Sequence, residues 1–249
     1  MWPTGECTGA TPAGTRIYAI GDVHGCADLL DRLHAMIRAD AAEAPEPRKV
    51  AVYLGDYVDR GADSAGVIDR LLGDPLPGFE RICLKGNHED FMLRFLDAPS
   101  SGGLWMMNGG GSTLASYGVT ETRPSGSAAQ SYGLADALRE RLPAAHRRFL
   151  EGLKLMHREG DYLFVHAGVR PGTPLDDQVE EDLLWIREPF LGSLEDRGYV
   201  VVHGHTPVDA PEVLFNRINV DTGAVWTRRL TAVVLHGDER YFLDTADAE

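Results

Sequence analysis

Cysteine is scarce in this chain of 249 residues, and its three cysteines, Cys7, Cys26 and Cys83, form no CxxC pair. Such a sparse, odd set excludes a disulfide framework and favours reduced thiols in the cytoplasm. Long hydrophobic runs are also missing, so no span is long enough to cross a bilayer. The first fifteen residues lack the basic start and apolar core of a signal peptide, and we expect residues 1–14 to form a flexible leader.

Basic residues are few as well: 24 lysines and arginines stand against 38 acidic residues, which gives a formal net charge of −14. This balance argues against nucleic acid and against an anionic membrane surface as partners. The sequence also has no GxxxxGK[ST], no GxSxG and no GxGxxG between a strand and a helix. The absence of these motifs excludes several common classes of nucleotide-binding protein and hydrolase. The oligomeric state stays open.

What is present is an alternation of short apolar runs with helical periodicity. The runs at 16–22, 49–56 and 80–87 predict buried strands, each followed by a helical pattern, and further strands are expected at 161–168, 199–206, 217–223 and 230–243. We expect one α/β domain over residues 15–249. A helical stretch is predicted at 134–153.

Residues 100–130 break this rhythm, because they are rich in Gly and Ser but carry Trp105, Met106 and Met107. Two interpretations stay open for this segment: a cap or substrate-facing insertion, or a short helix under a loop. The three glycines at 109–111 are expected to form a flexible loop.

Five short strings place Asp, Asn or His directly after apolar runs: GDVHG at 21–25, GDYVDRG at 55–61, GNHE at 86–89, VHAG at 165–168 and GHT at 204–206. If the backbone stays extended, Asp22 and His24 leave the same face of their strand. Asp56 has a carboxylate that could bridge two cations. Burying so many ionisable groups without a cation would cost several kcal/mol. Oxygen and imidazole ligands without thiolates suit Mn²⁺, Fe or Zn²⁺.

Together these strings resemble the motif series of the PPP-type serine/threonine protein phosphatases, within the calcineurin-like metallophosphoesterases. The resemblance covers about residues 16–243, and LLWIRE at 183–188 and INVDTGA at 218–224 are similar to segments of small bacterial and phage members. It implies a four-layer α/β/β/α sandwich with two mixed β-sheets and a site at the strand ends. It also implies two metal sites, the first held by Asp22, His24 and Asp56, and the second by Asp56, Asn87, His166 and His205.

The resemblance also implies which residues take part in catalysis and in phosphate binding. His88 is the candidate general acid, because the alkoxide of a phosphoserine is a poor leaving group. Asp59 is paired with His88 and orients its ring. Phosphate oxygens would be bound by Arg60, Asn87 and Arg187. Two divalent ions, expected to be Mn²⁺ with Fe or Zn²⁺ as alternatives, would offset the acidity of the chain at the site.

The sequence therefore predicts a serine/threonine protein phosphatase that acts on a phosphoprotein or phosphopeptide. One alternative is a dinucleoside polyphosphate (diadenosine tetraphosphate) hydrolase, a branch that typically lacks the Asp of GDYVDRG and has GNHD instead of GNHE. A second alternative is a non-catalytic metal-binding module. The Cys-x₅-Arg spacing from Cys26 to Arg32 is interpreted as accidental, because Leu29 and Leu30 between them lie on an apolar helix face.

Overall fold

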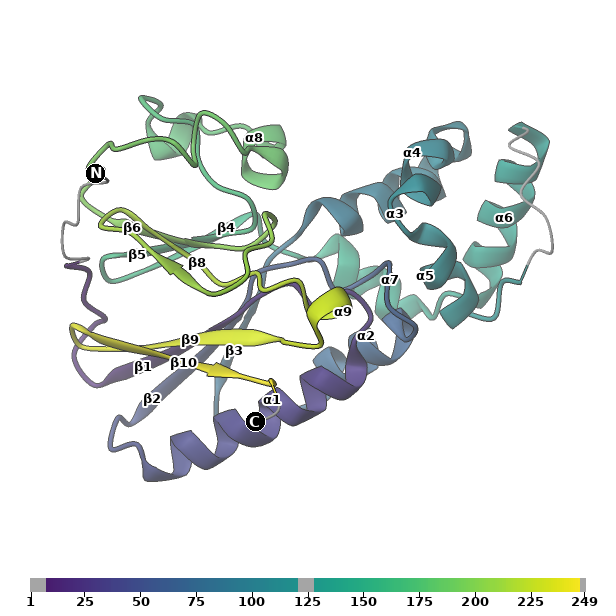
Figure 1. Cartoon of the computed structure of the whole chain (residues 1–249). Coiled ribbons are helices and arrows are strands. Elements are labelled where there is room, and N and C mark those ends of the chain that lie inside the picture. The colour runs from purple at the N-terminus through teal and green to yellow at the C-terminus, as the bar shows by residue number, and fades with distance from the viewer. Residues whose placement is uncertain (1–7, 121–127, 247–249) are drawn as a thin grey trace.

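The computed structural model describes residues 8–120 and 128–246, and in it two five-stranded sheets stack face to face (Figure 1). Each sheet mixes parallel and antiparallel pairs, and helices cover both outer faces. The predicted four-layer sandwich with two mixed sheets is confirmed.

The first sheet has the order β10-β9-β1-β2-β3. Three parallel strands form its centre and one edge: β1 (Thr15–Ile20), β2 (Arg48–Tyr53) and β3 (Glu80–Cys83). The hairpin of β9 (Thr231–His236) and β10 (Glu239–Asp244) adds antiparallel to β1. The crossover helices α1 (Ala27–Glu43) and α2 (Ser64–Leu72) pack on its outer face. This wrapping buries β1 on both faces, which explains its continuous apolar run.

The second sheet has the order β4-β5-β6-β8-β7. Its strands are β4 (Met156–Glu159), β5 (Tyr162–Val165), β6 (Val200–His203), β7 (Glu212–Val213) and β8 (Arg217–Asn219). The short helices η2 (Leu175–Asp177) and α8 (Glu180–Trp185) lie on its outer side. Sequence patterns missed β4 and β7, which are a half-buried strand and a two-residue strand.

Side chains alternate between two apolar cores along β1. Ile17 and Ala19 belong to the core between the sheets, whereas Tyr18 and Ile20 face the helices. The two sheets also meet through a parallel bridge between Leu84 and Lys154, beside β3 and β4. The carboxyl ends of the central strands of both sheets are thereby held at a fixed spacing.

A helical region extends from the strand ends of the first sheet (Figure 1). It contains α3 (Asn87–Asp97), η1 (Pro99–Ser101), α4 (Gly102–Met107), α5 (Gly110–Ser116), α6 (Ala128–Arg141) and α7 (Ala144–Glu151). The described part of 100–130 is therefore mostly helical and packs on α2 and α3, and residues 121–127 lie outside the described residues. The expected flexible loop at 109–111 is wrong, since Gly110 and Gly111 begin α5. The stretch predicted at 134–153 is interrupted at Pro143, which separates α6 from α7.

Part of the expected leader lies against the domain. The amide of Thr11 donates to Gly237 O (2.9 Å) in the β9–β10 turn, and the amide of Ala10 donates to the Asp161 carboxylate (3.1 Å) before β5. Residues 8–14 thus join the two sheets at the end opposite the helical region, whereas residues 1–7 lie outside the described residues. Within the described ranges, no helix combines the length and apolar character needed to cross a membrane.

Candidate metal centre

The five motif strings converge where the strands of both sheets end. Asp22 and His24 follow β1, and Asp56 follows β2. Asn87 and His88 begin α3 just after β3, while His166 and His205 follow β5 and β6. All of these side chains are buried. The side chains predicted to hold metal thus come together from both sheets, as their positions after strands indicate.

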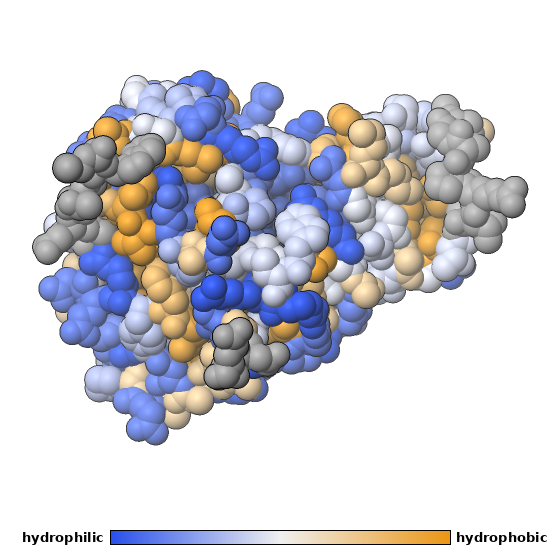
Figure 2. Space-filling view, in the orientation of Figure 1, coloured by the Kyte–Doolittle hydropathy of each residue, from blue (hydrophilic) through white to orange (hydrophobic). Residues whose placement is uncertain are grey.

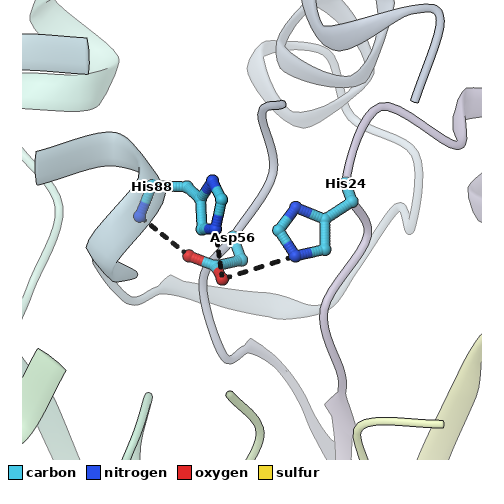
Figure 3. A group of neighbouring side chains, drawn as sticks. All are labelled: His24, Asp56 and His88. Atoms are coloured by element: carbon cyan, nitrogen blue, oxygen red, sulfur yellow. Dashed lines mark hydrogen bonds and ion pairs between the residues drawn. The ribbon is translucent and has the colours of Figure 1, made fainter. Parts of the chain in front are cut away.

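Asp56 lies at the centre of the cluster. Its Oδ2 is 3.5 Å from Nε2 of His24 and 3.9 Å from Nε2 of His88 (Figure 3). Its other oxygen, Oδ1, is 3.5 Å from Nε2 of His166. Two groups of potential metal ligands share this carboxylate, one with His24 and His88 and the other with His166 and His205. A shared carboxylate between two ligand groups is the arrangement of a dinuclear centre.

Asn87 joins the second group through its amide oxygen. Nε2 of His166 and Nδ1 of His205 each lie 2.9 Å from Asn87 Oδ1. The amide oxygen therefore faces both imidazoles. This places Asn87 where the sequence predicts it, beside the two histidines of the second sheet.

Asp22 has a less direct place than expected. Among the described residues it belongs to neither closely spaced group, and its carboxylate accepts the backbone N–H of His205 (3.1 Å). Burial, followed by the charges of Asp221 and Asp56, raises its pKa well above the usual range. An acid held neutral in this way can become a charged ligand once a cation arrives.

Asp221 is a site residue that sequence patterns did not identify. It lies buried just after β8, and burial raises its pKa to about 6. Its Oδ1 accepts the backbone N–H of Gly223 (2.9 Å). The similarity of INVDTGA to segments of family members was the only sequence signal for this segment, because Asp221 does not stand at a spacing typical of metal ligands.

Backbone strain is concentrated at the site. Six non-glycine residues in the described ranges have positive φ, and five of them lie in the motif strings: His24, Asp56, Asp59, Arg60 and His205. Such conformations cost about 1–3 kcal/mol each and persist where the surroundings fix them. The extended backbone expected from Asp22 to His24 is wrong, since φ of His24 is 44°.

Glycines let the motif loops approach one another. A Cβ on Gly61 would lie 2.0 Å from the carbonyl oxygen of His24, and one on Gly86 would lie 2.1 Å from Asp56 Oδ1. Any side chain at these positions would push the loops apart. The glycines that flank the ligands therefore serve close packing between motifs.

Glu89, the last residue of GNHE, organises the loop that carries Asp56. Its fully buried carboxylate accepts backbone N–H groups of Asp56 (2.9 Å), Tyr57 (2.7 Å), Val58 (3.2 Å) and Gly86 (2.9 Å). These donors satisfy the carboxyl oxygens and lower the pKa of Glu89, but burial and the charge of Asp56 outweigh them and raise it to about 7. The motif contained this residue, but sequence spacing gave no hint of its partners.

His88 is oriented by a chain of buried hydrogen bonds. Its Nδ1 donates to Asp59 Oδ2 over 2.7 Å. The same carboxylate accepts from Nε1 of Trp105 (2.9 Å) and from the hydroxyl of Thr113 (2.6 Å). The helices α4 and α5 thus hold Asp59, which in turn holds the imidazole. The Asp59 to His88 pair implied by the family resemblance is present.

The guanidinium of Arg60 contacts both imidazoles of the first ligand group, those of His24 and His88. Its Nη1 donates to His24 Nε2 (2.6 Å) and its Nη2 donates to His88 Nε2 (3.0 Å). Burial and this guanidinium lower the pKa of His88, but Asp56 and Asp59 outweigh them, and the net shift is upward. When Arg60 turns toward a phosphoryl group, Nε2 of His88 is free to carry a proton.

The other predicted arginine, Arg187, lies exposed at the start of the loop after α8. It makes no ion pair within the described ranges, and its charge helps to lower the pKa of His205 and His166, after the larger effect of burial. The positive charge of Arg187 therefore affects the second ligand group, which contains both of these histidines. Its predicted contact with phosphate stays a prediction.

The chemistry of the donor set fits divalent cations. Burial lowers the pKa of His24 to about 3 and that of His205 to about 2, so both rings are neutral and able to ligate at physiological pH. Nε2 of His205 is buried and has no hydrogen-bond partner among the described residues. Burial raises the pKa of Asp56, but the positive charges that the surrounding imidazoles carry when protonated together outweigh burial and hold this pKa below its usual range. Neutral imidazoles around an ionised carboxylate form a cation site.

Cys26 lacks the surroundings of a catalytic thiolate. Its buried Sγ donates to the carbonyl oxygen of His24 (3.6 Å), and burial raises its pKa. Reactive cysteines instead have depressed pKa values. The Cys-x₅-Arg spacing has no support in the geometry.

Comparisons with known proteins agree with this geometry. The family model for calcineurin-like phosphoesterases matches residues 15–239. A bis(5'-nucleosyl)-tetraphosphatase PrpE [asymmetrical] of Halalkalibacterium halodurans is 26% identical over 235 residues, covering 86% of this chain and 87% of its own length. Serine/threonine-protein phosphatase 1 of Salmonella typhimurium is 28% identical over 221 residues, covering 86% and 89%.

Solved structures share the fold. A putative diadenosine tetraphosphatase superposes with a TM-score of 0.65 at 21% identity, covering 96% of this chain and all of its own. A cold-active protein tyrosine phosphatase mutant superposes with a TM-score of 0.58 at 18% identity, covering 97% and 82%. At these identities, the likeness concerns the architecture alone.

Proposed function

Since this chain belongs to the calcineurin-like phosphoesterase family, we propose that it hydrolyses dinucleoside tetraphosphates, such as diadenosine tetraphosphate, with two divalent metal ions. The reaction adds water across one phosphoanhydride bond, and asymmetric cleavage would give ATP and AMP. The observation that carries the hydrolase assignment is Asp56, whose two oxygens face imidazoles from both sheets.

The residues that would hold the ions are Asp22, His24 and Asp56 for one, and Asp56, Asn87, His166 and His205 for the other, with His88 beside the first as the proton donor. Two divalent ions bound there would polarise phosphoryl oxygens and activate a water for direct attack on phosphorus. We expect Mn²⁺, with Fe or Zn²⁺ as alternatives, because imidazole and carboxylate ligands suit all three.

The remaining site residues act on the phosphoryl group itself. Arg60 can exchange its bonds with His24 and His88 for two parallel bonds to phosphoryl oxygens. Arg187, exposed just after α8, is the second candidate for binding the phosphoryl group. His88, oriented by Asp59, can then pass a proton from Nε2 to the departing oxygen.

The choice of a dinucleotide departs from the protein phosphatase that the motifs predict. Two differences favoured the protein phosphatase: the Asp of GDYVDRG and the Glu of GNHE. Asp59 is fully buried beneath His88, and within the described residues the hydrogen bonds of Glu89 are with backbone amides. Both side chains thus support His88 and the motif loops, which a dinucleotide hydrolase also needs. Several relatives that cover most of this chain are named bis(5'-nucleosyl)-tetraphosphatases, which supports the dinucleotide.

A protein phosphatase is the second candidate, and one observation favours it. The pKa of His88 lies above its ordinary value, because Asp56 and Asp59 outweigh burial. A protonated acid is most useful when the leaving group is an alkoxide, as in a phosphoserine, and least useful when it is a nucleotide phosphate. The relative named serine/threonine-protein phosphatase 1 points the same way.

A direct comparison of substrates tests the proposal. The Mn²⁺-loaded protein is assayed with diadenosine tetraphosphate and with phosphoserine peptides, and the nucleotide products are separated by chromatography. We expect a higher kcat/KM for the dinucleotide, with ATP and AMP as products. A higher kcat/KM for the peptides would reverse the order of the two candidates. Failure to hydrolyse either substrate or p-nitrophenyl phosphate would favour a non-catalytic metal-binding module.

A further inference from the structure

Resting on the proposed function, we propose that Trp226 is a specificity-determining residue that stacks a nucleobase of the substrate. Trp226 lies on the short helix α9 (Ala224–Thr227), and 62% of its surface is exposed. Tryptophan side chains of soluble proteins are normally well buried. An indole exposed to this extent beside a reaction centre therefore indicates a role in binding a ligand.

Trp226 contacts Arg60, and Arg60 in turn contacts residues of the metal centre. The guanidinium carbon of Arg60 lies 5.0 Å from the centroid of its ring, within the range of a cation–π interaction. The same guanidinium contacts His24 and His88. A polyphosphate chain bound by Arg60 therefore begins beside the indole, where an attached nucleoside can reach it.

The platform that carries Trp226 is fixed. Gly223 precedes α9 as its N-cap in the left-handed region (φ 68°), and its amide donates to the buried carboxylate of Asp221. Thr227 at the other end of α9 donates its hydroxyl to Thr222 O (2.8 Å). A stacking ring must hold its orientation before the base arrives, and these bonds supply that rigidity.

The space beside α9 suits a nucleoside better than a free phosphate. A cavity of about 430 Å³ lies between the loops that follow His24 and Arg60 and the α9 segment, where Val225 and Arg228, rather than Trp226 itself, line it. Its two arginines, Arg70 and Arg228, are already paired with Asp31 and Asp28. Carboxylates at such a wall accept hydrogen bonds from ribose hydroxyls and from base amino groups, whereas the paired arginines offer a phosphate little net positive charge.

The surroundings of Trp226 argue against a protein partner at this position. In the face shown in Figure 2, the surface around α9 is coloured mainly blue to white, with little orange. Protein-docking surfaces usually present a larger contiguous apolar patch. A single aromatic ring in a polar surface is the arrangement that stacks a base.

Inhibition by two small anions tests the inference without requiring dinucleotide turnover. ADP and inorganic pyrophosphate differ by an adenosine, and both are measured as competitive inhibitors of p-nitrophenyl phosphate hydrolysis by the Mn²⁺-loaded protein. A base stack contributes about 1–3 kcal/mol, so Trp226→Ala should raise the Ki of ADP about 5- to 150-fold. The Ki of pyrophosphate should stay within about twofold, and Trp226→Phe should retain most of the affinity for ADP.

The controls separate stacking from an indirect effect through Arg60. Equal rises in both Ki values would show that Trp226 only positions Arg60, and unchanged values would show that no base binds there; either result overturns the inference. Tyr132→Ala removes another exposed aromatic side chain, on α6, and should change neither value. If the wild type fails to cleave diadenosine tetraphosphate but ADP inhibition still depends on Trp226, the proposed substrate fails and the base site stands.

Discussion

Asp56 and His88 lie 3.9 Å apart at their nearest charged atoms, yet they have separable tasks. Asp56 faces both ligand groups, so Asp56→Asn should lose both metals. His88 is held by Asp59 at one ring nitrogen, so His88→Asn should keep its metals and lower kcat about 10²–10⁴-fold, the range for loss of a general acid. Elemental analysis after dialysis, combined with saturation kinetics, measures both quantities. Equal metal loss in the two variants would make His88 a ligand and contradict the division.

The pH dependence of turnover should report on His88. Its raised pKa means that the imidazolium form is present at and below pH 6.5 and is lost as the pH rises through the shifted value. We expect kcat for phenyl phosphate, which has a poor leaving group, to fall on the alkaline side. For p-nitrophenyl phosphate the fall should be smaller, because nitrophenolate leaves without a proton. Identical profiles for the two substrates would exclude His88 as the acid.

The metal-ligating residues could be predicted from the sequence wherever a motif places them directly after a strand. His24, His166 and His205 could be found in this way, because each follows an apolar run. Asp221 and Glu89 could not be assigned roles, since their partners lie at other strand ends or are backbone amides. Sequence spacing records neighbours along the chain, and these contacts are made across it.

At the scale of elements, α4 and α5 show why a glycine-rich segment can be ordered. Gly109 precedes α5 with φ 103°, and a Cβ there would lie 2.8 Å from the backbone nitrogen of Arg60. A Cβ on Gly110 would lie 2.5 Å from the Trp105 ring. Low helix propensity suggested a loop, but close approach to the site requires the absence of side chains. The segment positions Arg60 and Asp59.

Two neighbouring glycines offer a matched test. Gly109→Ala should lower the free energy of unfolding by about 1–2 kcal/mol or more, because of its left-handed backbone and its contact with Arg60, and should also reduce kcat. Gly111 is exposed within α5 and has nothing near its missing Cβ, so Gly111→Ala should raise stability by about 0.4–1 kcal/mol. Urea unfolding and saturation kinetics measure both effects. Similar effects at the two positions would contradict the close approach.

On the scale of the whole molecule, the metal centre joins the two sheets, because its ligand residues follow strands of both. Removing the ions leaves buried carboxylates uncompensated, so chelation should lower the thermal unfolding midpoint. Mn²⁺ at 100 times its dissociation constant should restore about 2.7 kcal/mol by mass action. Calorimetry with and without a chelator measures the change, and Asp56→Asn should show no response to Mn²⁺. An unchanged midpoint in the wild type would contradict metal binding at the sheet junction.

The overall architecture was predictable from alternation and motifs, down to two mixed sheets with helices outside. Strand β7 and the helix α9 were not, since two to four residues carry too little periodicity to be seen. Their positions are fixed by tertiary bonds, such as that from Gly223 to Asp221. Short elements of this kind are specified by the assembled fold.

The order of the first sheet has a consequence for synthesis on the ribosome. Strand β1 pairs with β2 on one side, but its other neighbour, β9, begins only at Thr231. Until that segment emerges, one edge of an otherwise apolar strand lacks its partner and is open to pairing with other chains. The last ligand, His205, also appears late, 183 positions after Asp22. Nascent chains therefore need protection from aggregation until nearly the whole sequence has been made.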